Sequence, residues 1–286
     1  PLGQATEDTR LFVVCDGMGG HEHGEVASQT VADTLGRCLA GHLQDGEPLS
    51  DAMLQEALGE AYRQLDANDS PSDTRKMGTT LTAVAFHAKG VVMAHIGDSR
   101  IYHFRPSQHD ILYESRDHSL VVDLYLSGEL TEQEMQTYEG KNIITRAMQP
   151  GMERRSKADV AHSTDLLPGD CFVLCTDGVL EHLSGEELLQ ALSDDATGDD
   201  EKCRHLKELT KGNADNHTAY LIRIRDVQRE KGDDTAPNDE TRTRCNMRVL
   251  VREMRRQEEQ QHDKPQGWLH RAFGHLFRAK GPDMGH

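Results

Sequence analysis

Four aspartates each stand where an apolar, strand-like run gives way to small or polar residues. They are Asp16, Asp98, Asp177 and Asp215. The run LFVV ends shortly before Asp16 and the run CFVLC shortly before Asp177, and glycines follow both, where backbone must approach another group closely. Carboxylate oxygens arriving from separate strand ends suit Mg²⁺ or Mn²⁺, which prefer oxygen ligands to nitrogen or sulfur. The pattern predicts a metal site whose chemistry is the activation of water.

Helix and strand patterns alternate in the part of the chain that must position these aspartates. Apolar residues recur at i+4 over residues 24–43 and 50–66, which predicts two consecutive amphipathic helices. β-Branched or aromatic runs with short breaks then predict antiparallel strands over residues 77–86, 90–97 and 99–104. The break between the first two strands predicts a hairpin.

The later part of the domain has the same mixture of elements. Ser184 and Glu187 form a capping-box pattern that predicts a helix through Leu192. A polar-faced helix is expected near residues 200–211, and a strand closes the series at residues 217–224. Helix pairs beside antiparallel strands predict an α+β layered sandwich instead of a parallel βαβ sheet.

The composition excludes several classes of protein. A net charge of −17 argues against a general nucleic-acid binder, because phosphate backbones are held by clustered Lys and Arg. No run approaches the roughly 18 apolar residues of a membrane span. The six cysteines include no CxxC pair, and two lie inside apolar strands. This usage favours a reducing compartment, so we expect a cytoplasmic protein.

Charge divides the chain unevenly. Residues 1–226 carry a net charge of −19, whereas residues 227–286 carry +2. We assign the first part to the globular domain, residues 227–241 to a polar linker and residues 242–286 to a basic tail. Apolar residues around Trp268 have the period of an amphipathic helix. This helix either docks on the domain or is poorly ordered, or it contacts a partner protein or an anionic membrane surface.

The chain also carries a series of short motifs. In order, they are DGMGGH with GEVAS, GTT, AHIGDSR with IY, DHSLV, ITRAM, LCTDGV and DNHT, and they extend over nearly all of residues 11–224. In this order and spacing the chain resembles a bacterial-type member of the metal-dependent protein phosphatase 2C (PP2C, or PPM) family of serine/threonine phosphatases. The resemblance implies a PP2C-like αββα sandwich, in which two antiparallel β-sheets are flanked by helix pairs.

The resemblance also implies a role for each candidate residue. Asp16 matches the aspartate that bridges two metal ions, and the carbonyl of Gly17 matches a ligand of the second ion. Asp177 and Asp215 match the ligands that complete the first ion's shell, and Asp98 resembles a contributor to a third, weaker site shared with Asp177. The implied reaction is hydrolysis of phosphoserine and phosphothreonine by water that two Mn²⁺ or Mg²⁺ ions activate, without a covalent enzyme intermediate.

The N-terminal segment departs from the family pattern. The family begins with strands that carry an arginine for the substrate phosphate and acidic residues for the second metal. Neither is matched within residues 1–10. We expect this segment to be the hairpin connection after a first strand that lies upstream of Pro1, together with the arginine and the acidic residues.

Several positions have a structural alternative. Asp98 could brace the turn beside Arg100, and Asp215 could form an Asx-turn, because aspartates favour reversals. Residues 78–80 are expected to form a packing corner. Arg100 and Arg146 are interpreted as internal braces that pair with carboxylates.

Histidines near the motifs are expected to be structural. None belongs to an HxxxH pattern or to a Cys/His cluster typical of zinc sites. We therefore expect packing or hydrogen bonding from His21, His23, His95, His118 and His217.

Two functions remain open. The first is a monomeric phosphatase that acts on phosphorylated Ser/Thr proteins, opposes a cognate bacterial Ser/Thr kinase and selects peptides with a flap at residues 117–145. The second is a catalytically impaired relative that binds phosphoproteins or scaffolds a complex. Three converging carboxylates repel one another without a cation, and this favours the enzyme.

Overall fold

The computed structural model describes residues 6, 8–18, 21–45, 47–69, 77–140, 142–194 and 196–227 of the chain. All of them belong to the first of two compact units, Pro1–Cys245. The predicted tail and, apart from Val227, the predicted linker lie outside the described residues, so the amphipathic helix around Trp268 stays a prediction. Among the helices described, none is both long and apolar enough to cross a membrane.

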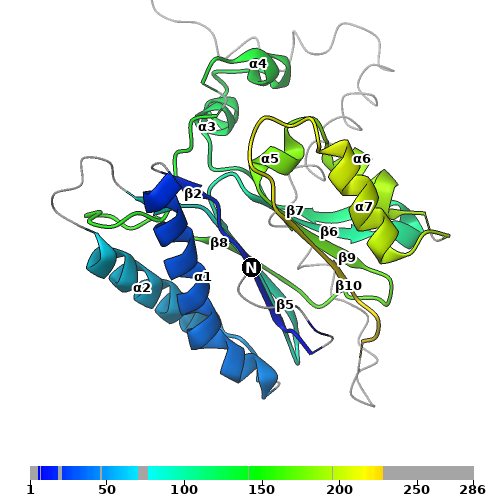
Figure 1. Cartoon of the computed structure of the whole chain (residues 1–286), viewed down its shortest axis with the longest axis horizontal. Coiled ribbons are helices and arrows are strands. Elements are labelled where there is room, and N and C mark those ends of the chain that lie inside the picture. Colours follow the sequence, from blue (N-terminus) through cyan, green and yellow to red (C-terminus); the bar gives the residue numbers. More distant parts are fainter. Residues whose placement is uncertain are drawn as a thin grey trace, which may run out of the picture. The chain divides into compact units, whose positions relative to one another are not determined.

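Two long helices pack side by side against the first sheet (Figure 1). They are α1 (His21–Gln44) and α2 (Asp51–Asn68), and they confirm the two predicted amphipathic helices. Ser50 caps α2 by accepting a hydrogen bond from the Met53 N–H at 3.3 Å. The apolar stripes of both helices are buried in one core cluster, which includes Val31, Leu35, Leu39, Leu54, Leu58 and Leu65.

The first sheet has the strand order β1-β4-β5-β8, and all neighbours are antiparallel. Its strands are β1 (Leu11–Val14), β4 (Leu81–His87), β5 (Gly90–Ile96) and β8 (Asp159–Ser163). The predicted hairpin joins β4 to β5. Along β4, Ala83 and Ala85 belong to the core under the helices, whereas Val84 belongs to the core between the two sheets.

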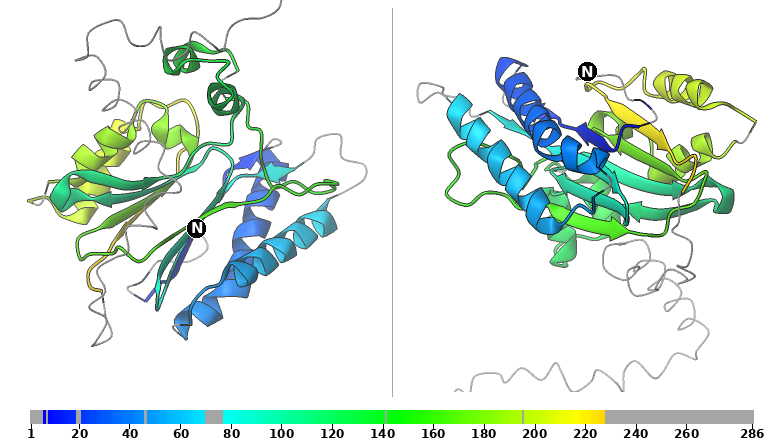
Figure 2. Two further views of the ribbon diagram at one scale, coloured as in Figure 1. Left: turned by 180° about the vertical axis from the view of Figure 1, so that it is seen from behind. Right: turned by 90° about the horizontal axis from the view of Figure 1, so that it is seen from below.

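The second sheet has the order β10-β9-β6-β7 and is also antiparallel. Its strands are β6 (Arg100–Arg105), β7 (Asp110–Glu114), β9 (Cys171–Cys175) and β10 (Ala219–Arg223), and the short 3-10 helix η1 (Pro106–Gln108) joins β6 to β7. Helices α6 (Gly185–Leu192) and α7 (Asp199–Leu209) cover its outer face (Figure 2). The predicted capping box of Ser184 and Glu187 is present at the start of α6. The layers confirm the predicted αββα sandwich.

The strand predicted over residues 77–86 is divided in two. Its start is β3 (Gly78–Thr79), which pairs with β2 (Gly17–Met18), and β4 begins only at Leu81. Strands β7 and β8 and the short helix α5 (Asp177–Leu180) have no counterpart among the predicted elements. Strand β8 is half-buried and contains polar residues, so its sequence lacks the apolar run that marks β9.

The flap region contains two short helices. Helix α3 (Leu120–Leu126) and helix α4 (Glu132–Thr137) are separated at Gly128, whose φ of +80° favours glycine. At the base of the flap, Ser119 and Ile144 form an isolated antiparallel bridge. The flap therefore consists of two short helices, and its two ends meet at the Ser119–Ile144 bridge.

Candidate metal centre

Asp16 follows β1, and two threonines of the GTT motif hold its backbone. The Asp16 N–H donates to Thr80 Oγ1 at 2.9 Å, and the Asp16 carbonyl accepts from the Thr80 N–H at 2.8 Å. The same carbonyl accepts from Thr79 Oγ1 at 2.9 Å. Both threonines are buried. These bonds fix the direction in which Asp16 leaves the sheet and confirm the predicted packing corner.

Gly17 lies in an exposed part of β2 that passes closely over α1. A Cβ atom at this position would lie 2.1 Å from the carbonyl oxygen of Gly24, which is too close for any side chain. The absence of a side chain therefore lets the backbone after Asp16 take this path.

Asp98 lies in the turn between β5 and β6. Gly97 before it has a φ of +106°, a conformation that favours glycine, and Ser99 after it is buried. The Ser99 and Thr80 hydroxyl oxygens are 2.8 Å apart and share a hydrogen bond. Thr80 thus contacts both the loop of Asp16 and the loop of Asp98.

Asp177 is the first residue of α5, directly after β9, and Asp215 lies in the loop before β10. Each carboxylate accepts a hydrogen bond from the next backbone N–H, at 2.7 Å in both cases. The two loops are joined because the Thr176 N–H donates to the Thr218 carbonyl at 3.0 Å. Strand pairing between β9 and β10 therefore brings two aspartates together that are distant in sequence.

The four carboxylates lie close enough for their charges to interact. Burial and the charges of Asp177 and Asp215 raise the pKa of Asp16 to about 6. Burial and the charges of Asp177, Asp117 and Asp16 raise the pKa of Asp98 to about 7. Burial and the charge of Asp215 also raise the pKa of Asp177. Such interactions weaken with distance, so the structure brings together the aspartates that the sequence singled out.

This set of donors fits a hard divalent cation. Carboxylate oxygens are the preferred ligands of Mg²⁺ and Mn²⁺ in proteins. A bound cation would favour the ionised form of each carboxylate and remove the repulsion that raises the pKa values of Asp16, Asp98 and Asp177. The protein therefore holds, at one point, the acidic groups that such an ion needs.

Asp117 also belongs to this cluster, although sequence reasoning did not place it there. Its charge raises the pKa values of Asp98 and Asp177. Arg100 holds it with two parallel hydrogen bonds, Nε to Oδ1 at 2.6 Å and Nη2 to Oδ2 at 2.7 Å. The available signal was the pair Asp-His at the start of the predicted flap, but only the fold shows the proximity of Asp117 to Asp98.

Both arginines that were interpreted as braces pair with carboxylates. Arg100 binds Asp117 and also approaches Glu114 at 3.3 Å, and Arg146 donates to Asp159 Oδ1 at 3.0 Å. This confirms the sequence interpretation. The side chain of His21 lies outside the described residues, whereas His95 and His118 are buried and hydrogen-bonded.

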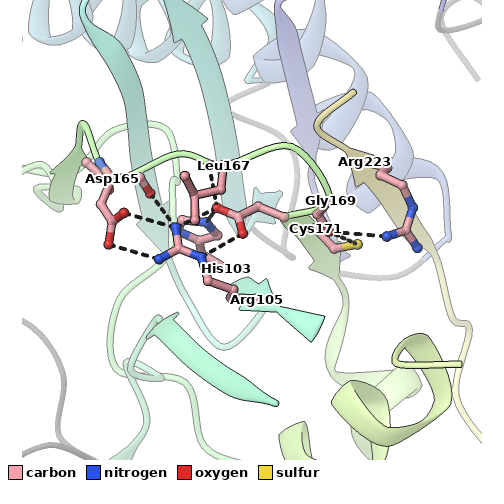
Figure 3. A network of polar contacts seen from close by, with 9 residues as sticks. His103, Arg105, Asp165, Leu167, Gly169, Cys171 and Arg223 are labelled. Carbon is pink, nitrogen blue, oxygen red and sulfur yellow. Dashed lines mark hydrogen bonds and ion pairs between the residues drawn. The ribbon is translucent and has the colours of Figure 1, made fainter. Parts of the chain in front are cut away.

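A second polar cluster lies at the opposite ends of β6 and β9 (Figure 3). Asp170, at the start of β9, accepts from Arg105 Nε and Nη2 at 2.9 Å each and from His103 Nε2 at 3.1 Å. The Leu167 N–H donates to it at 2.9 Å, and Asp165 binds the outer side of Arg105 at 3.0 Å. All the oxygens of this buried carboxylate are therefore satisfied within the chain.

Comparisons with known proteins agree with this architecture. A family model described as protein phosphatase 2C matches residues 2–211. A putative protein phosphatase 2C-type protein of Streptococcus pyogenes is 33% identical over 215 residues, which cover 74% of this chain and 85% of that protein.

Two solved structures are similar to this chain. The serine/threonine phosphatase PstP/Ppp of Mycobacterium tuberculosis matches with a TM-score of 0.64 and 32% identity, over 79% of this chain and 95% of that one. The PstP catalytic domain in complex with two manganese ions matches with a TM-score of 0.61 and 32% identity, over 79% and 94%.

Proposed function

This chain belongs to the protein phosphatase 2C family, and we propose that Asp16, Asp98, Asp177 and Asp215 form the metal centre with which this serine/threonine protein phosphatase works. The observation that carries the proposal is the convergence of these carboxylates, because burial and the neighbouring charges raise the pKa values of Asp16, Asp98 and Asp177. A module that only bound phosphoproteins would have no need for such repulsion. The enzyme is therefore favoured over the impaired scaffold.

The pattern of interactions supports the roles proposed for the four aspartates. Asp16 and Asp177 each interact with all three of the others, whereas the interactions of Asp98 and Asp215 converge on these two. We assign Asp16, with the carbonyl of Gly17, to a position shared by two ions. Asp177 and Asp215 complete the first, and Asp98 with Asp177 serves a third, weaker position. Mn²⁺ is the first choice, because a similar structure holds two manganese ions, and Mg²⁺ has the same ligand preference.

Different residues of the chain would have different roles in phosphate-ester hydrolysis. When bound, divalent ions lower the pKa of water and offset the negative charge of the phosphate. Thr79 and Thr80 orient Asp16, and Thr80 also fixes the turn of Asp98 through Ser99. Arg100 and Arg146 already bind carboxylates, so we assign them no contact with the phosphate.

The proposed substrates are proteins phosphorylated on serine or threonine. This proposal is supported by the similar proteins named serine/threonine phosphatases. A cognate Ser/Thr kinase would produce these substrates, and the expected cytoplasmic location and monomeric state belong to the same proposal.

The experiment is phosphate release from a phosphothreonine peptide, measured against Mn²⁺ concentration with the full chain. Wild-type protein should release phosphate only with the metal, and Asp16→Asn should lower kcat/KM by about 10³-fold, because a metal ligand contributes several kcal/mol at the transition state. The matched control is Asp51→Asn, which changes an exposed aspartate at the start of α2 and should leave the rate unchanged.

Calorimetry with Mn²⁺ and the phosphopeptide separates the two candidate functions. If wild-type protein binds both but releases no phosphate, the scaffold function is correct and the phosphatase proposal fails. If Asp16→Asn retains the wild-type rate, the metal centre has been placed wrongly.

A further inference from the structure

A second group of potential metal ligands lies beside the metal centre. His95 in β5, His118 at the start of the flap and Asp159 in β8 each offer a ligand atom, and these atoms lie within 4.8 Å of one another. Both histidines are buried, with relative exposures of 2% and 3%. The question is whether these residues bind a cation or do something else.

The geometry of this group does not suit a cation. The two imidazole rings are stacked, with centroids 4.6 Å apart and an interplanar angle of 12°. Their lone pairs lie in the two ring planes, which are separate and nearly parallel, so they do not meet at one ion, although His95 Nδ1 has no hydrogen-bond partner. Arg146 also supplies a positive charge, with Nη1 3.0 Å from Asp159 Oδ1 and 3.2 Å from His118 Nε2.

The hydrogen bonds of His118 connect three separate parts of the fold. Its Nδ1 accepts from the Gly97 N–H at 3.0 Å, so in the neutral ring Nε2 carries the hydrogen. Nε2 lies 3.2 Å from Asp159 Oδ2, to which it donates. This hydrogen bond holds the pKa of Asp159 well below its usual range. The two ring nitrogens of His118 therefore bind different parts of the fold, Nδ1 the backbone of Gly97 and Nε2 the carboxylate of Asp159.

The backbone of His118 strengthens the same connections. Its N–H donates to the Gly97 carbonyl at 2.9 Å, and its carbonyl accepts from the Thr145 N–H at 2.8 Å. Gly97 is thus bound twice by His118, and Thr145 closes the base of the flap next to the Ser119–Ile144 bridge. One residue contacts both the turn that carries Asp98 and the base of the flap.

The turn of Asp98 is held from two sides. A Cβ atom on Gly97 would lie 2.7 Å from Thr80 Cγ2, so Thr80 closes one side of this turn, and it also binds Ser99. His118 closes the other side through both polar atoms of the Gly97 backbone. The turn that carries Asp98 is therefore held by both Thr80 and His118.

We propose that His118 is a positioning residue of this phosphatase, which aims Asp98 through Nδ1 and fixes the base of the flap to the first sheet through Nε2. The proposal rests on the proposed function of the metal centre. Residues that orient metal ligands in this way typically change metal affinity or activity by about 10–100-fold when replaced. The two nitrogens should have separable effects, since one faces the metal centre and the other faces β8.

Two substitutions imitate one nitrogen each. In His118→Asn the amide oxygen lies near the place of Nδ1 and can still accept from Gly97. In His118→Gln the longer side chain places its amide near Nε2, where it can still donate to Asp159, while the acceptor for Gly97 is lost. We expect His118→Gln to raise the Mn²⁺ concentration for half-maximal activity by about 10–100-fold.

We expect His118→Asn to keep the wild-type Mn²⁺ dependence and to raise KM for a phosphothreonine peptide, because only the attachment of the flap is weakened. Asp159→Asn should resemble His118→Asn, since it weakens the same contact from the other side. The matched control is His162→Gln on β8, where an exposed histidine binds Asp51 at 2.8 Å. It should leave both parameters unchanged.

Equal Mn²⁺ dependence of His118→Gln and His118→Asn would overturn the proposal, as would a fall in melting temperature without any change in KM or Mn²⁺ dependence. Asp159→Asn guards against a failure of the His118 variants to fold, and a shifted Mn²⁺ dependence in it would also contradict the division of roles. Mn²⁺ calorimetry on the same proteins keeps the test independent of turnover. If wild-type protein binds Mn²⁺ but releases no phosphate, the proposed function fails, while a difference in Mn²⁺ affinity between the two variants still supports the positioning role.

Discussion

Strands β6 and β9 have carboxylates near both ends, half-buried at one end and buried at the other, and the two ends are built in opposite ways. At one end, burial and neighbouring carboxylates raise the pKa values of Asp98 and Asp177. At the other end, burial by itself would raise the pKa of Asp170, but hydrogen bonds from His103 and Arg105 lower it to about 2 (Figure 3). Arg105 neutralises Asp170 at the second end, whereas at the first end Arg100 pairs with Asp117 and the remaining carboxylates would need a cation from solution. This difference separates the part of the sandwich that serves stability from the part that serves chemistry.

The same substitution at the two ends of β9 should therefore have opposite consequences. Asp177→Asn should lower kcat/KM for a phosphothreonine peptide by about 10³-fold, because it removes a metal ligand. It should not lower the melting temperature of the metal-free protein, because it also removes a repelling charge. Steady-state kinetics and thermal unfolding in a chelator measure the two effects. A large loss of stability in the metal-free protein would show that Asp177 stabilises the fold, as Asp170 does.

Asp170→Asn should lower the free energy of unfolding by about 3 kcal/mol, since it leaves the buried Arg105 with only the more exposed carboxylate of Asp165. The kcat of the protein that remains folded should not change. Urea unfolding gives the first quantity and active-site-normalised kinetics the second. Asp199→Asn is the control, because Asp199 pairs with Arg223 at a more exposed site and should cost less than about 1 kcal/mol.

Bound Mn²⁺ should supply to the metal centre the positive charge that Arg105 supplies to Asp170 at the other end. At a Mn²⁺ concentration 100 times the dissociation constant, the free energy of unfolding should rise by about 2.7 kcal/mol. Asp16→Asn should lose most of this gain, and Asp170→Asn should keep it. Denaturant unfolding with and without the metal measures the difference. Equal stabilisation of Asp16→Asn and wild-type protein would place the ion elsewhere.

Acid should destabilise the folded protein through the end of β9 where Arg105 pairs with Asp170. The pKa of Asp170 is about 2 in the folded protein, below its ordinary value of 3.8, so its contribution is present above pH 4 and is lost as the pH falls toward 2. This contribution is about 2 kcal/mol. Unfolding free energies measured between pH 5 and pH 2 should show a steeper decline for wild-type protein than for Asp170→Asn. Parallel curves would contradict this origin of the acid sensitivity.

The metal centre should show the opposite dependence on pH in the metal-free protein. The pKa of Asp98 is raised from 3.8 to about 7, so between these values the folded protein retains a proton that the unfolded chain releases. The free energy of unfolding should therefore fall as the pH rises through this window. Asp98→Asn should flatten the curve and stabilise the metal-free protein at pH 8 by up to about 4 kcal/mol. A destabilised Asp98→Asn protein would show that Asp98 is instead a structural brace of its turn.

Much of the fold was predictable because its elements depend on local patterns. The two helices over residues 24–43 and 50–66 have long apolar stripes, and the Ser184 capping box depends only on neighbours in sequence. Strand β9 is apolar along its whole length, so it was visible as well. Strand β8 was missed because its half-buried residues have no comparable pattern, and the break between β3 and β4 was missed because it follows from bonds between Thr80 and the distant Asp16.

The candidate site was also predictable only in part. Asp16, Asp98, Asp177 and Asp215 were recognisable because each follows a strand pattern and belongs to a local motif. Asp117 was not assigned to the cluster, because its relation to Asp98 exists only after β5, β6 and the base of the flap have been brought together.

The sequence alone determined which residues could bind a metal, because ligand chemistry is a property of the residue type and its immediate neighbours. The tertiary structure decided which polar and charged groups meet. It brought Asp117 to Arg100, His118 to Gly97 and Asp170 to Arg105. Each of these pairs joins segments that are distant in the chain, and electrostatic energy depends on distance in space and on burial, neither of which a local pattern contains.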